Sequence, residues 1–416
     1  MKKNSGANPL WTRDFTIITL GSVVSMLGNA MSGFAMSLLV LDYTKSALLY
    51  AIFIAVFTLP QIFMPIFSGA ILDRFSRKKT IYILDFISAI LYGSAAFLLR
   101  DGWFSFVALA IYCFLLGSIH SIYTVAYQSF YPLLITEGNF SKAYSMSSLL
   151  ETMTALMIPI STFAYNMIGI APLLGVNAVS FFIAAVMETQ IKTKEEYIEK
   201  RKLDEKDVKS SGKVVLADMK EGFRYLLREK GLLAIAIYFT FASLSGGAAS
   251  VITLPFFKAN YDNGEYIYML VWGMAVVGKA IGGVIHYRLN LPAKWKYTAA
   301  LSVYVATALL EGFYLYFTIP TMMKLCFING LLSVTSYTIR ISATQSYVPD
   351  EKKGRFNGAF NMLYTVGSFS GELLAGALTT VIPVRGVLTT FMVTTAAAAI
   401  IVLGGNRKSV KAILNT

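Results

Sequence analysis

The sequence predicts an all-α membrane protein with twelve transmembrane helices in two pseudo-symmetric six-helix bundles. Of its 416 residues 56 % are hydrophobic and only 14 % are charged, and the mean hydropathy is +0.61. These values lie outside the range of ordinary soluble domains. Apolar segments of about 20 residues, enough to cross a bilayer core as a helix, follow one another along the chain. The two halves of the chain also carry related motifs, which predicts a duplicated architecture.

Twelve apolar segments lie between charged, proline, glycine or asparagine breaks. The first follows a short polar start, is too long for a removed signal peptide and lacks a small-residue cleavage site, so we expect it to remain as a helix. Cys113 and Cys326 both fall inside apolar segments, so no disulfide framework is expected. The predicted spans are residues 14–41, 46–72, 80–99, 103–131, 143–168, 171–189, 231–257, 266–287, 296–318, 320–347, 356–381 and 384–404.

The positive charges divide unevenly between the two sides of the predicted membrane. With the amino terminus inside, the inner segments hold 29 of the 36 Lys and Arg residues, whereas the outer loops hold five. Lys and Arg are enriched in cytoplasmic loops, so both termini are expected in the cytoplasm and the protein in the cell (inner or cytoplasmic) membrane. The net charge of +13 therefore reflects topology and does not indicate a nucleic-acid partner.

Short motifs recur at about half the chain length. Residues 113–117 (CFLLG) return as 326–330 (CFING), and 128–132 (QSFYP) return as 345–349 (QSYVP). We expect a six-helix bundle over residues 1–190, a cytoplasmic linker over 191–230 and a second six-helix bundle over 231–416. The linker should form an amphipathic surface helix over 214–228. Residues 191–213 are either an ordered part of the linker or plain disorder.

Polar residues recur at helical spacing on four of the apolar segments, in repeat-related pairs. Segments 1 and 7 share a 3-4-3 spacing of Ser, Thr, Asn or Gly, and segments 4 and 10 carry bulkier polar groups. Such stripes are expected where helices face a water-filled route, although small residues at this spacing also form helix-packing seams. The candidates for a substrate cavity are Ser25, Asn29, Ser32, His120, Thr124, Tyr127, Ser243, Ser250, Tyr337 and Arg340.

Ionisable groups inside spans cost several kcal/mol unless they are paired or hydrated, so each is a functional candidate. A carboxylate in a low dielectric has a raised pKa and can exchange protons near neutral pH. The candidates for proton coupling are Glu151, Glu311, Glu372 and Lys279. Static pairing between helices is the alternative for these charges, and Arg340 is close enough to the inner surface to snorkel. Glu188 lies near a span end, where we expect it to be solvated.

A charged loop after the second span carries the most specific motif. Residues 69–79 read GAILDRFSRKK, with five charges in the seven residues from Asp73 to Lys79. This pattern resembles the signature loop of the major facilitator superfamily. Residues 39–46 (LVLDYTKS), 219–225 (MKEGFRY) and 348–355 (VPDEKKGR) resemble the drug-efflux branch of that family, which includes macrolide-efflux and siderophore-export proteins.

The resemblance implies two bundles that rock around a central cavity lined by helices 1, 4, 7 and 10, which gives access from each side in turn. It also implies that the loop is a conformational latch, and the latch residues are Gly69, Asp73, Arg74, Arg77 and Asp85. A latch of a few kcal/mol is enough to bias a two-state equilibrium. The alternative is that the loop only determines topology.

The expected function is export of an amphipathic small molecule of the drug, macrolide or siderophore type, coupled to proton antiport, by a monomer that needs no cofactor or metal. Cys113 replaces a helix 4 arginine that some antiporters of the family carry, so the coupling residue is not given by motif. A lipid or lysolipid flippase of the same family is the alternative, and a non-transporting membrane sensor is a remote one. An enzyme is not expected, because the two His residues belong to no catalytic constellation.

Overall fold

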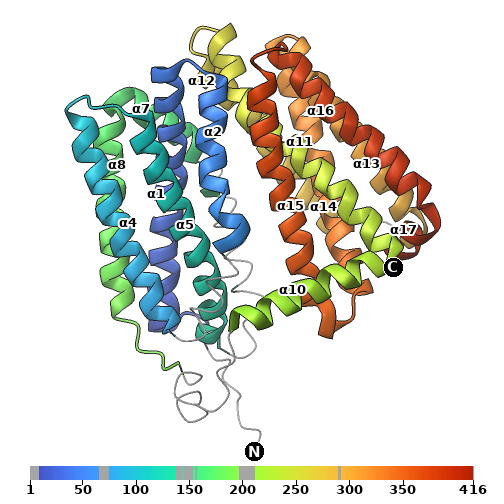
Figure 1. The fold of residues 1–416 in the computed structure, drawn as a ribbon, viewed down its shortest axis with the longest axis horizontal. Coiled ribbons are helices and arrows are strands. Elements are labelled where there is room, and N and C mark those ends of the chain that lie inside the picture. The colour runs from blue at the N-terminus through green and yellow to red at the C-terminus, as the bar shows by residue number, and fades with distance from the viewer. Residues whose placement is uncertain are drawn as a thin grey trace, which may run out of the picture. The chain divides into compact units, whose positions relative to one another are not determined.

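The computed structural model describes residues 9–64, 75–136, 143, 153–154, 157–195, 211–288 and 292–415. All regular elements within these residues are helical, and ten of the described helices are long and apolar enough to cross a membrane (Figure 1). The predicted all-α membrane class is confirmed. Part of the fifth predicted span, residues 143–168, lies outside the described residues.

The helices follow the predicted spans along the chain, and two amphipathic helices, one of them in the predicted linker, lie outside these spans. In the first half they are α1 (Arg13–Thr44), α2 (Ala47–Thr58), α4 (Arg77–Arg100), α5 (Phe106–Phe130), the 3-10 turn η1 (Tyr131–Leu134), α7 (Met157–Ile168) and α8 (Ile170–Thr189). In the second half they are α10 (Ser211–Arg228), α11 (Lys230–Asn260), α12 (Gly264–Arg288), α13 (Ala293–Phe313), η2 (Tyr314–Tyr316), α14 (Ile319–Tyr347), α15 (Asp350–Leu378), α16 (Val384–Ala398), the π turn η3 (Ala399–Leu403) and α17 (Arg407–Leu414).

The chain divides into two compact units. Unit 1 comprises residues 1–43 and 59–215, and unit 2 comprises residues 44–58 and 216–416. The second predicted span is therefore shared, because α2 packs on α15 of unit 2. The Cα of Gly376 on α15 faces Ala51, whose Cβ lies 2.4 Å from where a Cβ on that glycine would be. The apolar length of this span predicts a helix but not the neighbour on which its outer part packs.

In unit 1, α4 and α8 pack along their lengths, and α5 lies against α4 (Figure 1). Serine side chains cap the N-termini of both α4 and α5, where Ser76 and Ser105 accept backbone N–H bonds from Lys79 and Ala108. A cluster of buried apolar side chains joins α1, α4, α5 and η1, and includes Phe15, Ile81, Phe130 and Leu134. This cluster fixes the end of unit 1 that holds the charged loop.

In unit 2, the helices pack in close pairs, α11 with α15, α12 with α14 and α13 with α16. The α11–α15 contact depends on glycine. A Cβ added to Gly371 would lie 1.8 Å from the carbonyl oxygen of Leu244, so only a glycine lets the two backbones come this close. Without a hydrophobic driving force between helices in lipid, such small-residue contacts provide the packing that holds a membrane bundle together.

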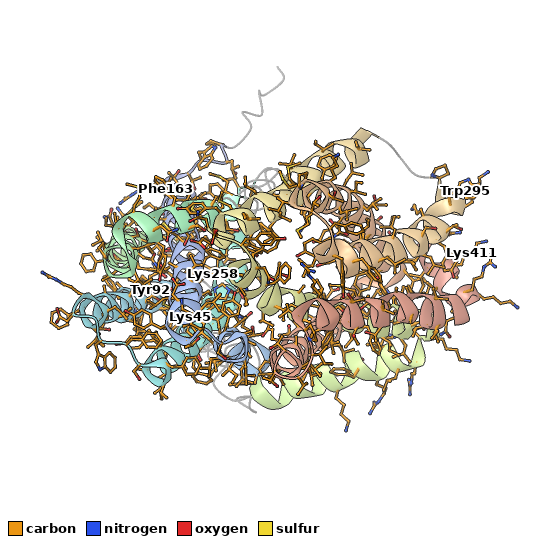
Figure 2. The ribbon with its side chains drawn as sticks, turned by 90° about the horizontal axis from the view of Figure 1, so that it is seen from above. Lys45, Tyr92, Phe163, Lys258, Trp295 and Lys411 are labelled. Carbon is orange, nitrogen blue, oxygen red and sulfur yellow. The ribbon has the colours of Figure 1, made fainter. Side chains whose placement is uncertain are left out.

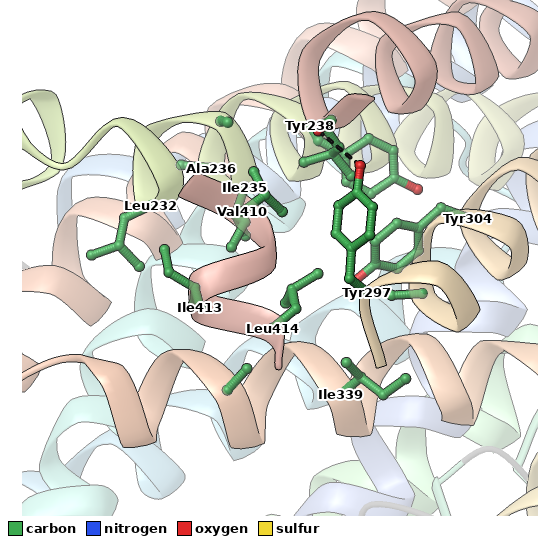
Figure 3. Close-up of a cluster of buried hydrophobic side chains, with 14 of the residues drawn as sticks. Leu232, Ile235, Ala236, Tyr238, Tyr297, Tyr304, Ile339, Val410, Ile413 and Leu414 are labelled. Carbon is green, nitrogen blue, oxygen red and sulfur yellow. Dashed lines mark hydrogen bonds between the residues drawn. The ribbon is translucent and has the colours of Figure 1, made fainter. Parts of the chain in front are cut away.

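The short helix α17 closes one end of unit 2. Its apolar residues Val410, Ile413 and Leu414 are buried against Leu232 of α11 and its neighbours (Figure 3). In the same cluster the rings of Tyr238 and Tyr304 stack at 4.7 Å, and the Tyr297 hydroxyl donates to the carbonyl of Leu403 over 3.3 Å. A helix with apolar residues on one side only is stable here because that side is covered by the bundle.

The amphipathic helix expected over 214–228 is present as α10, and its C-terminal part docks on unit 2. Leu226 is buried in the same apolar cluster as α17. The ammonium of Lys352 at the start of α15 lies 4.8 Å from the ring centroid of Tyr225, and the hydroxyl of Tyr347 donates to Glu229 over 3.2 Å.

Outward faces of the spanning helices carry large apolar side chains (Figure 2). Phe163 on α7 is 58 % exposed and is one of many such residues. In a multi-pass membrane protein these side chains are covered by lipid, so their exposure needs no protein partner.

Candidate functional site

The polar stripe of α1 faces the inside of unit 1. The Ser25 hydroxyl donates to Asp85 of α4 over 3.3 Å, and Asn29 accepts a 2.9 Å bond from the hydroxyl of Tyr92. Ser32 is fully buried. In this structure Ser25 and Asn29 therefore bond to polar groups of α4, and Ser32 is packed inside unit 1. Their proposed place along a route for substrate stays a prediction.

The same interface contains a pair of buried carboxyl groups. Asp85 on α4 is 1 % exposed and Glu188 on α8 is 0 % exposed. Both lie against the same stretch of α1, because the Ser25 hydroxyl bonds to Asp85 and Gly21, four residues earlier, lies against Glu188. The expectation that Glu188 is solvated near its span end is wrong, because the start of α1 covers it: a Cβ on Gly21 would lie 2.9 Å from Glu188 Oε1.

The stripe of α5 is less buried. His120 is exposed and Thr124 is half-buried, and the Thr124 hydroxyl donates to the His120 carbonyl over 2.8 Å. Tyr127 stacks between Tyr123 and Tyr131, with ring centroids 6.1 and 5.1 Å away. His120, Thr124 and Tyr127 remain candidates for contact with a small molecule.

The stripe of α11 is a packing seam for most of its length. Ser243 is 2 % exposed, and its hydroxyl donates to the Thr240 carbonyl over 3.0 Å. It lies against Gly367 of α15, where an added Cβ would be 2.3 Å from the Ser243 hydroxyl. Ser243 therefore packs two helices together in this structure. Ser250, further along the helix, is exposed and donates to the Gly247 carbonyl over 2.7 Å.

Arg340 of α14 is surrounded by aromatic rings from three helices of unit 2. Its guanidinium carbon lies 4.8 Å from the Phe239 ring centroid on α11, 4.9 Å from Phe360 on α15 and 5.6 Å from Tyr337 on its own helix. Among the described residues no carboxylate pairs with it, and its Nε is buried without a hydrogen-bond partner. Tyr337 is 60 % exposed. An arginine held by ring faces keeps its N–H groups available for an anion.

The other predicted charges of unit 2 are separate from this cluster. Glu372 of α15 is buried and accepts hydroxyl bonds from Thr58 and Ser368 over 3.3 and 3.2 Å, and its Oε2 has no partner in the described part of the chain. Glu311 accepts from the Asn329 amide over 3.3 Å. Lys279 is exposed. Glu151 lies outside the described residues.

The charged loop is described only from its end onward, because Gly69, Asp73 and Arg74 lie outside the described residues. Arg77 donates to the Ser129 carbonyl at the end of α5 over 3.0 Å. The Arg77 backbone N–H donates to Glu195 Oε1 over 2.8 Å, and the Ser76 hydroxyl also bonds to Glu195. A carboxylate at this position satisfies free N–H groups and the positive end of the α4 dipole.

A second carboxylate anchors the same segment to α1. Asp14 Oδ2 accepts bonds from the backbone N–H groups of Lys192 and Thr193 over 3.0 and 2.7 Å, and from the Thr193 hydroxyl over 2.6 Å. Residues 191–195, expected to be linker or disorder, therefore join the starts of α1 and α4. Asp85 lies deeper in unit 1, where it accepts a hydrogen bond from Ser25. Its expected part in the latch stays a prediction, because Asp73 and Arg74 lie outside the described residues.

Asn177 and Tyr92, in the interior of unit 1, were not predicted from the sequence, and Glu188 was expected to be solvated. Asn177 of α8 is fully buried, and its side-chain amide has no partner among the described residues. Asn177 and Glu188 are 11 residues apart, three helical turns, so a polar stripe on α8 was available as a signal. The described residues contain no group of three or more His, Cys, Asp or Glu that could hold a metal ion.

Sequence comparison identifies the relatives of the chain. A family model described as the Major Facilitator Superfamily matches residues 18–372. The uncharacterized MFS-type transporter YkuC of Bacillus subtilis (strain 168) is 25 % identical over 325 residues, which cover 72 % of this chain and 74 % of YkuC. Macrolide efflux protein A of Streptococcus pyogenes is 22 % identical over 281 residues, 66 % of either chain and so just under two thirds of the efflux protein.

Solved structures agree on the fold. The nucleoside transporter NupG superposes with a TM-score of 0.66 at 11 % identity, covering 95 % of this chain and 98 % of NupG. A bacterial homologue of the iron transporter ferroportin in an inward-facing state gives 0.66 at 14 % identity, covering 96 % and 98 %. At these identities the likeness concerns the fold alone.

Proposed function

The chain belongs to the major facilitator superfamily, and on this premise we propose that it exports an amphipathic small molecule of the drug, macrolide or siderophore type. The proposed mechanism is alternating access, in which a binding site opens to each side of the membrane in turn. Proton antiport is proposed to drive export, and both termini are proposed to lie in the cytoplasm of the cell that carries the protein.

The observation that carries the proposal is the unpaired Arg340 among aromatic rings. A guanidinium that lacks a carboxylate partner is costly in a spanning helix unless a ligand or water meets its N–H groups. Phe239 and Phe360 stabilise the cation through their ring faces and offer apolar surface beside it. A cargo with an acidic group next to a planar or apolar body fits both features.

The relatives support export without fixing the cargo. Macrolide efflux protein A is, by its name, an exporter of macrolides. A macrolide carries an amine, whereas Arg340 favours an acid, so the charge of the cargo is where this chain is proposed to differ. Discrimination between cargoes of opposite charge depends on repulsion of the wrong cargo as much as on attraction of the right one.

Glu372 supports the proton part of the proposal. It is buried in unit 2, accepts only hydroxyl donors and has no cationic partner among the described residues. A buried carboxyl without a cation is stable when it holds a proton. It can therefore take up a proton while the protein is open to one side of the membrane and release it while the protein is open to the other.

The test is binding to the purified protein, measured as thermal stabilisation by erythromycin, ethidium, a catecholate siderophore and lysophosphatidylglycerol. We expect stabilisation by the acidic compounds that is lost in Arg340→Ala and partly kept in Arg340→Lys. Arg385→Ala is the matched control, because Arg385 lies over Phe256 and Tyr316 at 5.1 and 5.7 Å in the same unit. Stabilisation by ethidium alone, independent of Arg340, would contradict an acidic cargo.

Flipping of an anionic lysolipid is the second candidate, because its phosphate would use the same guanidinium. The two are separated in proteoliposomes by following a fluorescent lysolipid from one leaflet to the other. If the lysolipid moves in a way that depends on Arg340 and the siderophore does not move, lipid flipping replaces export of a soluble cargo as the function we propose.

A further inference from the structure

Two acidic side chains from different helices lie against neighbouring turns of α1 in the interior of unit 1, Asp85 at Ser25 and Glu188 at Gly21. Asp85 comes from the third turn of α4 and Glu188 from the last turn of α8, and the two helices pack along their lengths. Both side chains are essentially inaccessible to solvent. A carboxylate moved out of water needs a cation, several hydrogen-bond donors or a proton to be stable there.

Within the described part of the chain, this pair has neither a cation nor enough hydrogen-bond donors around it. The Ser25 hydroxyl on α1 faces it, Ser22 lies one turn earlier on the same helix, and Tyr123 of α5 is the neighbouring titratable group. Among the described residues only Ser25 makes a hydrogen bond to the pair, and its hydroxyl donates to Asp85. No described group donates to either oxygen of Glu188, and no described Lys, Arg or His forms an ion pair with either residue.

Unused hydroxyls point to a small ligand at the same place. The hydroxyls of Thr19, Ser22 and Tyr123 are buried, and none of them has the geometry of a hydrogen bond to another group in the described part of the chain. Space is limited, because the backbone of α1 at Gly21 lies against Glu188 Oε1. A proton fits this space and supplies the donor that two facing carboxylates lack.

We propose that Asp85 and Glu188 share one proton and form a proton-binding site inside unit 1. In the bound state the carboxylic acid of one residue donates its O–H to the carboxylate of the other, so one negative charge is removed and the remaining one is hydrogen-bonded. Release of the proton to water leaves two carboxylates facing each other, and their repulsion drives α4 and α8 apart next to α1.

The site differs from the coupling candidates Glu151, Glu311, Glu372 and Lys279, and it lies near the predicted cytoplasmic end of unit 1. Its role in driving transport rests on the proposed function. The binding of the proton does not, because it can be measured with no cargo present. A failure of proton binding can therefore be distinguished from a failure of the proposed transport function.

The test is infrared difference spectroscopy of the full-length protein in detergent, following the C=O stretch of protonated carboxyl groups as pH is raised. We expect a band at neutral pH that declines at higher pH in the native chain and is missing from the variant Asp85→Asn, Glu188→Gln. Contributions of other buried acids cancel when the variant is subtracted. The control Glu195→Gln removes a carboxylate that accepts backbone N–H bonds and should leave the band unchanged.

A second measurement keeps the proposal testable if the double variant folds poorly. The folded chain holds a proton that the unfolded chain has lost at neutral pH, so the unfolding temperature should fall as pH rises through the range where the pair ionises. In Glu188→Gln, whose amide can donate to Asp85, this fall should disappear. An identical band in the native chain and the double variant would overturn the proposal, as would stabilisation by Na⁺ at constant pH that requires both carboxyls.

Discussion

Replacement of Gly371 by alanine tests how rigidly α11 and α15 are joined. The added Cβ would lie 1.8 Å from the carbonyl oxygen of Leu244 and 3.1 Å from the amide nitrogen of Ala248, whereas ordinary contact begins at 3.4 Å. Both neighbours are backbone atoms that cannot rotate away, so the helices must separate along the seam. Overpacking of this kind costs about 1–3 kcal/mol, and we expect the upper end of that range.

The assay is chemical unfolding of the purified protein in detergent, with Gly358→Ala as the matched control. Gly358 is on the same helix, and an added Cβ there meets nothing within 4 Å. Because alanine is the better helix former, the control should be unchanged or stabilised by up to about 1 kcal/mol. Equal unfolding midpoints for the two variants would refute the reasoning that backbone contact at Gly371 sets the helix separation.

Two further predictions concern hydrogen bonds of unit 1. Tyr92→Phe removes the donor to Asn29 and leaves a half-buried amide oxygen unpaired, so the free energy of unfolding should fall by about 1–2 kcal/mol; an unchanged midpoint in chemical unfolding would show that the bond is not needed. Glu195→Gln keeps the acceptor at the start of α4 but removes its charge, so stability should fall by up to about 1 kcal/mol at low salt. That loss should shrink at high salt, and a salt-independent loss measured by the same unfolding assay would exclude the helix dipole as its cause.

The spans could be predicted because hydropathy measures the length of chain that is stable in lipid. It does not measure where a helix ends in water. The eleventh span was predicted to begin at 356, yet α15 begins at Asp350 and includes the charged run that looked like a loop. The sharing of the second span between the two units could not be predicted either, since α2 is apolar on all sides and its sequence does not identify α15 as its neighbour.

The sequence was enough to find several residues of the candidate site but only partly enough to find which neighbours they face. Arg340 could be found as a lone cation in an apolar segment, whereas its partners Phe239 and Phe360 belong to other helices and depend on tertiary packing. The spacing of the α1 serines correctly indicated one polar face. It did not show that this face meets Asp85, because the period of a helix is the same whether a stripe faces water or another helix.

The bond between Thr58 and Glu372 joins residues that are 314 positions apart in the chain. At a synthesis rate of about 5–20 residues per second, α2 leaves the ribosome roughly 15 to 60 seconds before the helix on which it packs. During that interval its inner face has only lipid, or another protein of the insertion machinery, to contact. A nascent chain halted before α15 should therefore be a poor folding unit even though its first helices are complete, and quality-control proteases would meet it in that state.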